Sequence, residues 1–105
     1  MSHERYQMEA DGLIASRIAQ LRGLRFDRAS MLPEAAGEEL LIAGRKCAVT
    51  TFRQQLTPAD VLVTDQVARR TLAGLASVHA EKGLIFSRDG SVRDASPEEL
   101  LASGG

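Results

Sequence analysis

Cysteine, proline and aromatic residues are scarce in this sequence, and tryptophan is absent. The single cysteine, Cys47, excludes a disulfide within the chain and a cysteine-rich metal cage. The aromatic residues are too few and too scattered to form a platform on which nucleic-acid bases would stack; they are Tyr6, Phe26, Phe52 and Phe86. Internal repeats and low-complexity tracts are also missing, so nothing in the composition divides the chain into parts.

An excess of charge of one sign is missing as well. There are 13 basic and 14 acidic residues, and the net charge of −1 means that the chain as a whole does not attract a polyanion. No apolar run approaches the roughly 18 residues of a membrane span, and the N-terminus lacks the pattern of a secretory signal. We therefore expect a cytoplasmic protein, with a frayed N-terminus at 1–10, a single domain at 11–102 and a flexible tail at 103–105.

Known catalytic signatures are absent. The sequence has neither the glycine patterns of nucleotide-binding loops nor the Gly-x-Ser-x-Gly and His-Glu-x-x-His motifs. Its two histidines are His3 and His79, and a zinc site would require Cys47, His79 and further ligands to converge without any supporting spacing. We therefore expect no metal and no cofactor.

The stretch from Arg45 to Arg70 organises the predicted fold. Both halves are rich in Val, Thr and Phe, and Thr57-Pro58 separates them, which is typical of two antiparallel strands and their connection. The expected register places Phe52 opposite Val63 and Thr50 opposite Asp65. One face then carries Ala48, Phe52, Val61, Val63 and Val67, while the polar face carries Thr51, Arg53, Thr64, Gln66 and Arg70.

Helical spacing of apolar residues predicts a helix on either side of this hairpin. The first begins at Asp11 and ends near Gly23, with Ile14 and Ile18 toward the sheet and Arg17 facing outward. The second, a middle helix over 71–83, has a shared face made of Leu72, Leu75, Val78 and His79.

A competing interpretation makes 58–82 one or two continuous helices, with Thr57 as the N-cap. The β-branched residues between Val61 and Val67 favour a strand instead.

Shorter elements complete the order. A strand at 39–43 turns at Gly44 into the main hairpin, and a short helical turn is expected within 24–37. Asp89-Gly90 predicts a C-terminal hairpin, and Ser96, Pro97 and Glu99 predict a short final helix. The sequence thus predicts an α+β fold with a small antiparallel sheet, made of a three-strand meander and a C-terminal hairpin, plus an N-terminal helix, a middle helix and a short C-terminal helix.

Asp65 is the clearest candidate for a functional side chain. Alternation along its strand places the carboxylate among valines on the face expected to line the core, where an unpaired charge is unfavourable. Its role is structural if Thr50, directly opposite, donates a hydrogen bond or if a bulge turns Asp65 outward. The functional alternative is a carboxylate used for binding or acid–base chemistry.

A basic cluster is expected at the open end of the same hairpin, made of Arg45, Lys46, Arg69 and Arg70. Like charges facing one another are unfavourable unless water or a bound anion lies between them. The cluster is therefore either a solvated fringe or an anion-binding site for phosphate or carboxylate.

Two further patterns bear on function. Helices over 66–83 with a turn at Gly74, followed by a wing at 84–94, would form a winged helix-turn-helix, although the second helix offers no arginine for a guanine edge. The terminal Gly104-Gly105 resembles the end of the ubiquitin-like sulfur carriers, whose last glycine is activated as an adenylate or thiocarboxylate. This chain departs from those carriers by its capped helix at 97–101 and its longer N-terminal part.

We therefore expect a small binding or interaction module without catalytic activity. Its partner would be a second copy of itself, as a homodimer, or another protein, bound through an uncovered sheet face or an edge strand. The alternatives are a winged-helix-like DNA-binding regulator and, less favoured, a small enzyme or a Gly-Gly carrier. Nucleic acid is not the favoured partner, and no membrane partner is expected.

Overall fold

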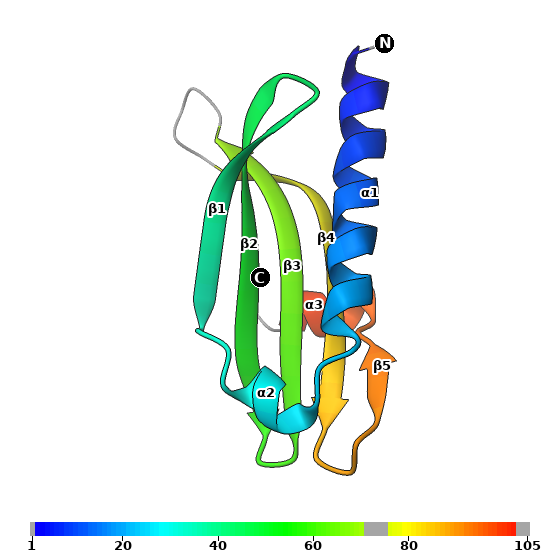
Figure 1. The fold of residues 1–105 in the computed structure, drawn as a ribbon, viewed down its shortest axis with the longest axis vertical. Coiled ribbons are helices and arrows are strands. Elements are labelled where there is room, and N and C mark those ends of the chain that lie inside the picture. Colours follow the sequence, from blue (N-terminus) through cyan, green and yellow to red (C-terminus); the bar gives the residue numbers. More distant parts are fainter. Residues whose placement is uncertain (1, 71–75, 103–105) are drawn as a thin grey trace.

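The protein folds into one antiparallel sheet with helices on both faces (Figure 1). The computed structural model describes the backbone of residues 2–70 and 76–102 and the side chains of residues 4–69 and 77–102. The elements in chain order are α1 (Ser2–Leu21), α2 (Phe26–Ser30), β1 (Ala35–Ile42), β2 (Arg45–Thr57), β3 (Asp60–Arg70), β4 (Ala76–Ser87), β5 (Val92–Asp94) and α3 (Pro97–Ala102). The strand order in the sheet is β1-β2-β3-β4-β5. The expected α+β class with an antiparallel sheet is confirmed.

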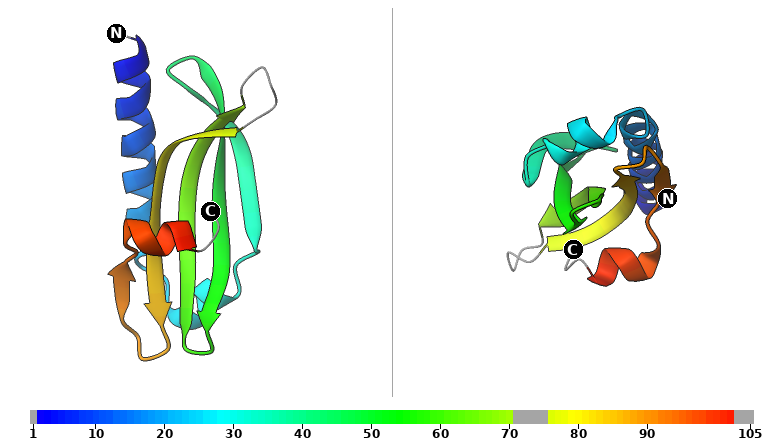
Figure 2. Two further views of the ribbon diagram at one scale, coloured as in Figure 1. Left: turned by 180° about the vertical axis from the view of Figure 1, so that it is seen from behind. Right: turned by 90° about the horizontal axis from the view of Figure 1, so that it is seen from below.

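Helix α1 packs on one face of the sheet, and α3 crosses the opposite, outer face (Figure 2). Residues four apart on α1, namely Tyr6, Ala10, Ile14 and Ile18, lie on one side of the helix and are buried. The sheet side of this core consists of Ile42, Cys47, Val49, Val61, Val63, Val67, Ala80, Leu84 and Phe86. Among the described residues, no helix is long and apolar enough to cross a membrane.

The outer face has a smaller apolar cluster of its own beneath α3. Leu62 and Ile85 are opposite each other on β3 and β4, and both are buried. A Cβ at Gly83 would come within 2.9 Å of Leu100 Cδ2 and 3.1 Å of Leu62 Cδ1. The missing side chain at Gly83 therefore lets Leu100 of α3 approach the sheet.

The N-terminal helix begins nine residues earlier than expected. Residues 2–10 belong to α1 rather than to a frayed end, and both Tyr6 and Ala10 are completely buried against the sheet. Sequence periodicity starting at Asp11 missed this segment because its inner face carries one tyrosine and one alanine rather than a row of large aliphatic residues.

The predicted middle helix is wrong for the described residues, because β4 begins at Ala76 and runs to Ser87. Residues 71–75, which hold part of that predicted helix, lie outside the described part of the chain. From Ala80 onward, pairing with β3 and burial of Leu84 and Phe86 decide the structure, and they override the helical spacing seen in the sequence. The alternative of continuous helix over 58–82 is excluded by β3 and β4.

The register of the main hairpin differs by one residue from the expected one. Thr57 pairs with Asp60 across a tight turn, but the register shifts between Gln55 and Thr57, so that Leu56 is an extra residue on β2. Because a shift of one residue turns every side chain to the other face, the expected β2 faces are reversed. Ala48 and Phe52 point to the outer face, whereas Cys47, Val49, Thr51 and Arg53 share the α1 side with the valines of β3.

The turns and the last helix follow their sequence signals. Ala43 and Gly44 have φ values of 49° and 77°, as the two positions of a tight hairpin turn between β1 and β2 require. Gly90 has a φ of 97° in the turn between β4 and β5. At the start of α3, Ser96 N donates to Glu99 Oε1 at 2.9 Å and Glu99 N donates to Ser96 Oγ at 3.1 Å, which is the expected capping arrangement.

Candidate functional site

Asp65 lies at the middle of β3, beneath α1, and its side chain is 1% exposed. Thr51 of β2 donates a hydrogen bond to Asp65 Oδ1. Arg17 of α1 donates from Nε to Asp65 Oδ2 at 3.1 Å and from NH2 to Thr51 Oγ1 at 3.1 Å. The three side chains therefore form a closed polar cluster that joins α1 to two strands.

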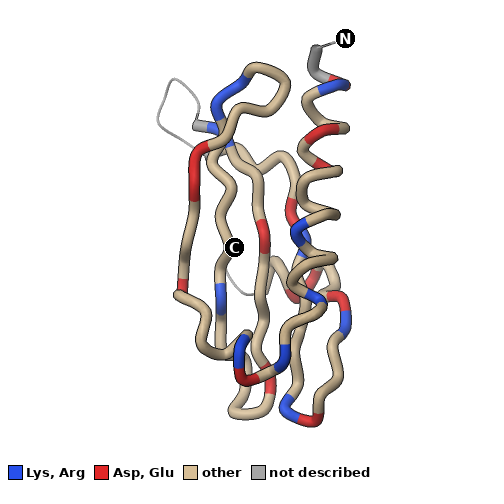
Figure 3. The backbone as a smooth tube through the Cα atoms, viewed as in Figure 1, with Lys and Arg blue, Asp and Glu red and all other residues tan. Residues whose placement is uncertain are grey.

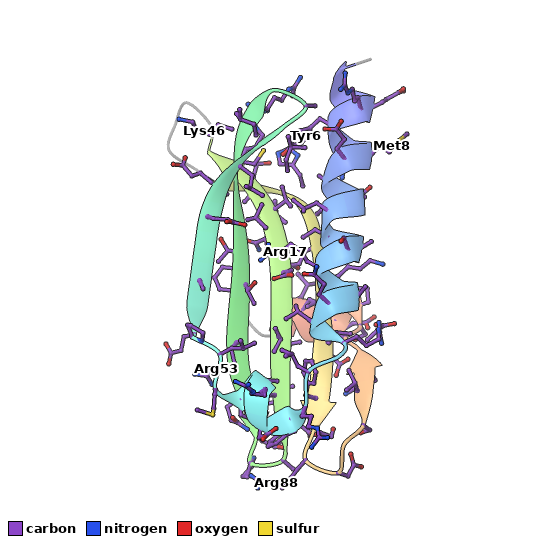
Figure 4. All side chains as sticks on the ribbon, viewed as in Figure 1. Tyr6, Met8, Arg17, Lys46, Arg53 and Arg88 are labelled. Carbon is purple, nitrogen blue, oxygen red and sulfur yellow. The ribbon has the colours of Figure 1, made fainter. Side chains whose placement is uncertain are left out.

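This cluster corrects two expectations. The residue opposite Asp65 is Thr51, and Thr50 lies opposite Gln66 on the other face, because of the bulge at Leu56. Arg17 faces the sheet rather than the solvent (Figure 4), and its second carboxylate partner is Glu38, with Oε1 3.6 Å from Arg17 NH1. Both carboxylate oxygens of Asp65 are satisfied, and the geometry is that of a buried tie between helix and sheet.

The four residues of the expected basic cluster are divided by the structure. Arg45 and Arg69 converge on the ring of Tyr6, with their guanidinium carbons 5.5 and 5.8 Å from its centroid. Lys46 alternates to the outer side of β2, is exposed, and lies away from Tyr6 (Figure 4). The side chain of Arg70 lies outside the described residues.

Tyr6 is the centre of this basic end and is fully buried. Its hydroxyl lies 3.3 Å from Cys47 Sγ, and its ring meets the edge of the His79 ring with centroids 5.1 Å apart. Burial raises the pKa of Tyr6 from 10.0 to about 12, the contact with Cys47 acts in the same direction, and the positive charges of Arg69 and Arg45 oppose the rise. Tyr6 is therefore a neutral phenol that offers its ring to two cations.

Arg69 has an unsatisfied donor at this point. Its Nε is buried and has no hydrogen-bond partner among the described residues. Buried donors of this kind are uncommon in native proteins, and one explanation is an ion or water molecule that completes the site. Sequence reasoning identified Arg69 as a candidate, but it could not identify Tyr6, which was assigned to the frayed N-terminus.

A groove of about 600 Å³ opens on the outer face of the sheet, with lining residues that reach from the start of β1 to Leu100 of α3. It is lined by Glu34, Ala35, Phe52, Arg53, Gln54, Gln55, Leu62, Thr64, Gln66, Glu81 and Leu100. Phe52 is 38% exposed there. The groove could not be predicted from the sequence, because strand alternation assigns Phe52 to the core and no sequence signal marks the bulge that moves it outward.

Strand β1 forms an acidic edge next to the groove (Figure 3). Glu34 precedes the strand, Glu38 and Glu39 lie in its middle, and residues 29–44 contain no lysine or arginine. The first five residues of β1 are exposed. Glu38 is the only one of the three acidic residues whose ion pair, with Arg17, is seen among the described side chains.

The alternative functions lose part of their structural basis. The winged-helix reading needs two helices over 66–83, and the described residues of that segment lie in β3 and β4. Gly104 and Gly105, on which the carrier resemblance rests, lie outside the described residues. In the described part of the chain, no group of three or more His, Cys, Asp or Glu side chains is placed to hold a metal ion.

Comparison of the chain with protein-family models, with curated proteins and with solved structures gave no match.

Proposed function

We propose that the protein is a non-catalytic interaction module that binds an extended segment of a partner protein along the free edge of β1. The observation that carries this proposal is the position of β1 at the end of the sheet: its eight residues pair with β2 on one side only. Such an edge presents backbone N–H and C=O groups that can pair with another strand.

The opposite edge of the sheet, formed by β4 and β5, is partly covered against pairing with another strand. The three residues of β5 pair with Leu84, Ile85 and Phe86 of β4. Further along β4, the register shifts so that His79 is an extra residue between Val78 and Ala80, and its carbonyl accepts a hydrogen bond from Gln7 Nε2 of α1 at 2.6 Å. Within the described residues, β5 and Gln7 therefore cover part of the far edge of β4, whereas the strand pairings give β1 a neighbour on one side only.

The groove on the outer face lies next to the β1 edge and supports the proposal that a partner segment binds there. Its lining includes Glu34, which precedes β1, Ala35, the first residue of β1, and Phe52 on the neighbouring strand. A strand added beside Ala35 would direct alternate side chains toward the outer face, where the groove opens. Backbone pairing would then supply affinity, and the groove would supply selectivity for one or two side chains.

The charge of β1 indicates which partner fits. Glu34, Glu38 and Glu39 favour a segment that carries lysine or arginine. A second copy fits less well, because antiparallel pairing of two β1 strands about their midpoint would bring Glu38 and Glu39 of one copy against those of the other. We therefore commit to a basic extended segment of another protein as the occupant, in preference to a homodimer.

The test uses the full chain, labelled with ¹⁵N, and a short peptide of alternating valine and lysine. We expect saturable amide shifts concentrated in residues 35–42, and an affinity reduced by about tenfold in the Glu39→Lys variant. The matched control is Glu4→Lys, the same charge change on the exposed first turn of α1.

Two control peptides separate strand addition from simple charge attraction. A valine–glutamate peptide should not bind, and the valine–lysine peptide methylated at every backbone nitrogen should not bind either, because it cannot donate to β1. Equal binding of the methylated peptide, or shifts centred away from β1, would contradict the proposal. A dimer in light scattering with protected β1 amides would replace the partner segment by a second copy.

A further inference from the structure

We propose that Arg45 and Arg69, held against Tyr6, form a binding site for an oxyanion, the phosphate or carboxylate group of a small ligand. The site lies at the end of the sheet near the turn between β1 and β2, on the α1 side. It is independent of the β1 edge and of the outer groove.

Packing fixes the two guanidinium groups before any ligand arrives. Both are half-buried, and both lie within cation–π distance of one buried ring, at 5.5 and 5.8 Å from its centroid. Tyr6 is itself held by Cys47 Sγ at 3.3 Å and by the edge of His79. A site whose donors are already ordered loses less entropy when it binds.

The electrostatics of this end favour a negative ligand. Two permanent positive charges converge on one uncharged phenol, and among the described residues Arg69 forms no ion pair with a carboxylate. An oxyanion beside Arg69 would supply the missing counter-charge and would be held by charge-assisted hydrogen bonds.

The buried Nε of Arg69 specifies what the ligand must supply. This donor has no acceptor in the described structure, and leaving a buried donor unpaired is costly. Guanidinium groups bind phosphate and carboxylate through parallel N–H donors, which lysine cannot reproduce. Lys46 lies on the other side of β2, so the site consists of the two arginines.

Arg88, which lies outside the proposed site, provides a matched comparison for Arg69. Arg88 also stacks on an aromatic ring, with its guanidinium carbon 5.1 Å from the centroid of Phe26. Unlike Arg69, it has an acceptor for its side chain, because NH2 donates to Pro58 O at 2.9 Å. Arg88 therefore has the cation–π contact without the unsatisfied donor, and it should not bind an oxyanion.

The experiment follows the arginine Nε–Hε signals by NMR while inorganic phosphate or acetate is added at constant ionic strength, balanced with chloride. We expect the Arg69 signal to shift saturably in the phosphate titration, the acetate titration or both, and the Arg88 signal to stay in place. Whichever anion binds more tightly identifies the group that the ligand carries.

Arg69→Lys keeps the charge and should weaken binding by about tenfold, because the planar donor pair is lost. Arg88→Lys should leave the affinity unchanged. No saturable shift at Arg69 in either arm, or equal shifts at Arg69 and Arg88, would overturn the proposal. If Arg69→Lys does not fold, the wild-type titration and the Arg45→Lys variant still test the proposed oxyanion site.

Discussion

The carboxylate of Asp65 joins three elements through one buried side chain. It is hydrogen-bonded by Thr51 and paired with Arg17, whose side chain is 27% exposed. We expect Asp65→Ala to lower the free energy of unfolding by about 2–4 kcal/mol, since Arg17 and Thr51 both lose a buried partner. Chemical denaturation followed by circular dichroism measures the change.

Two comparisons make this result specific. Arg5→Ala removes the exposed pair between Arg5 and Glu9 and should cost less than about 0.5 kcal/mol. Replacing both members of the buried pair, as Arg17→Met with Asp65→Leu, should cost less than Asp65→Ala alone. If Asp65→Ala is no more harmful than Arg5→Ala, the polar cluster does not contribute to stability.

Two glycines differ in what surrounds them, and they predict effects of opposite sign. Gly12 is exposed in α1 with nothing within 4 Å of an added Cβ, so Gly12→Ala should stabilise the protein by about 0.5–1 kcal/mol. At Gly83 an added Cβ meets Leu100, Leu62 and Thr64 at 2.9–3.2 Å, so Gly83→Ala should destabilise it by about 1–3 kcal/mol. Midpoints of thermal unfolding would show both effects. If Gly83→Ala raised the midpoint, α3 would be able to move away from the added Cβ without loss of stability.

For single residues, the sequence predicts correctly which β3 side chains share a face, but it predicts the wrong cross-strand partner for Asp65. Alternation places Asp65 among the valines, and the structure has Val61, Val63, Asp65 and Val67 buried on one face because no bulge interrupts β3 between them. The partner depends on β2, where the extra residue at Leu56 replaces Thr50 by Thr51.

Among the elements, α3 depends most visibly on pH. Two hydrogen bonds from Arg93, followed by the backbone N–H of Ser96, lower the pKa of Glu99 from 4.5 to about 2. The pKa in the folded state lies below the unfolded value, so the stabilisation from Glu99 is complete above about pH 4.5 and is lost as the pH falls toward 2.

We therefore expect wild type to lose its stability advantage over Glu99→Gln as the pH falls through this range. The stability of each variant at several pH values would measure it. Glu98→Gln controls for the loss of one carboxylate in the same helix turn. A difference between wild type and Glu99→Gln that does not change with pH would show that the pair with Arg93 does not form in solution.

The elements could be predicted where a short sequence signal determines the local geometry. Gly44, Asp89-Gly90 and the Ser96–Glu99 cap mark two turns and one helix start, and all three are confirmed. Strand β4 could not be predicted in this way, because its pairing with β3 is a contact between distant segments, and nothing local distinguishes Val78 and His79 on a strand from the same residues on a helix.

For the molecule as a whole, α1 supplies most of the helical side of the core, and Ala29 of α2 adds to it. Among the described side chains of α1, Tyr6 is the most N-terminal one that is buried, at 0% exposure, while Met8 on the other side of the helix is 74% exposed. We expect Tyr6→Ala to lower the free energy of unfolding by about 3–5 kcal/mol and Met8→Ala to leave it nearly unchanged. If Tyr6→Ala and Met8→Ala both changed the free energy of unfolding only slightly in denaturant titrations, the first turns of α1 would be detached from the sheet in solution.

The sequential order of the five strands has a consequence for how fast the chain folds. Each strand pairs with its neighbour in the sequence, so the hairpins can close over short loops. The contacts of α1 with β3 and β4 join segments that lie far apart along the chain, so we expect them to form last. If the helix docks after the rate-limiting barrier, Asp65→Ala should accelerate unfolding and hardly alter the refolding rate. A stopped-flow chevron in which the refolding limb drops instead would place the helix in the nucleus.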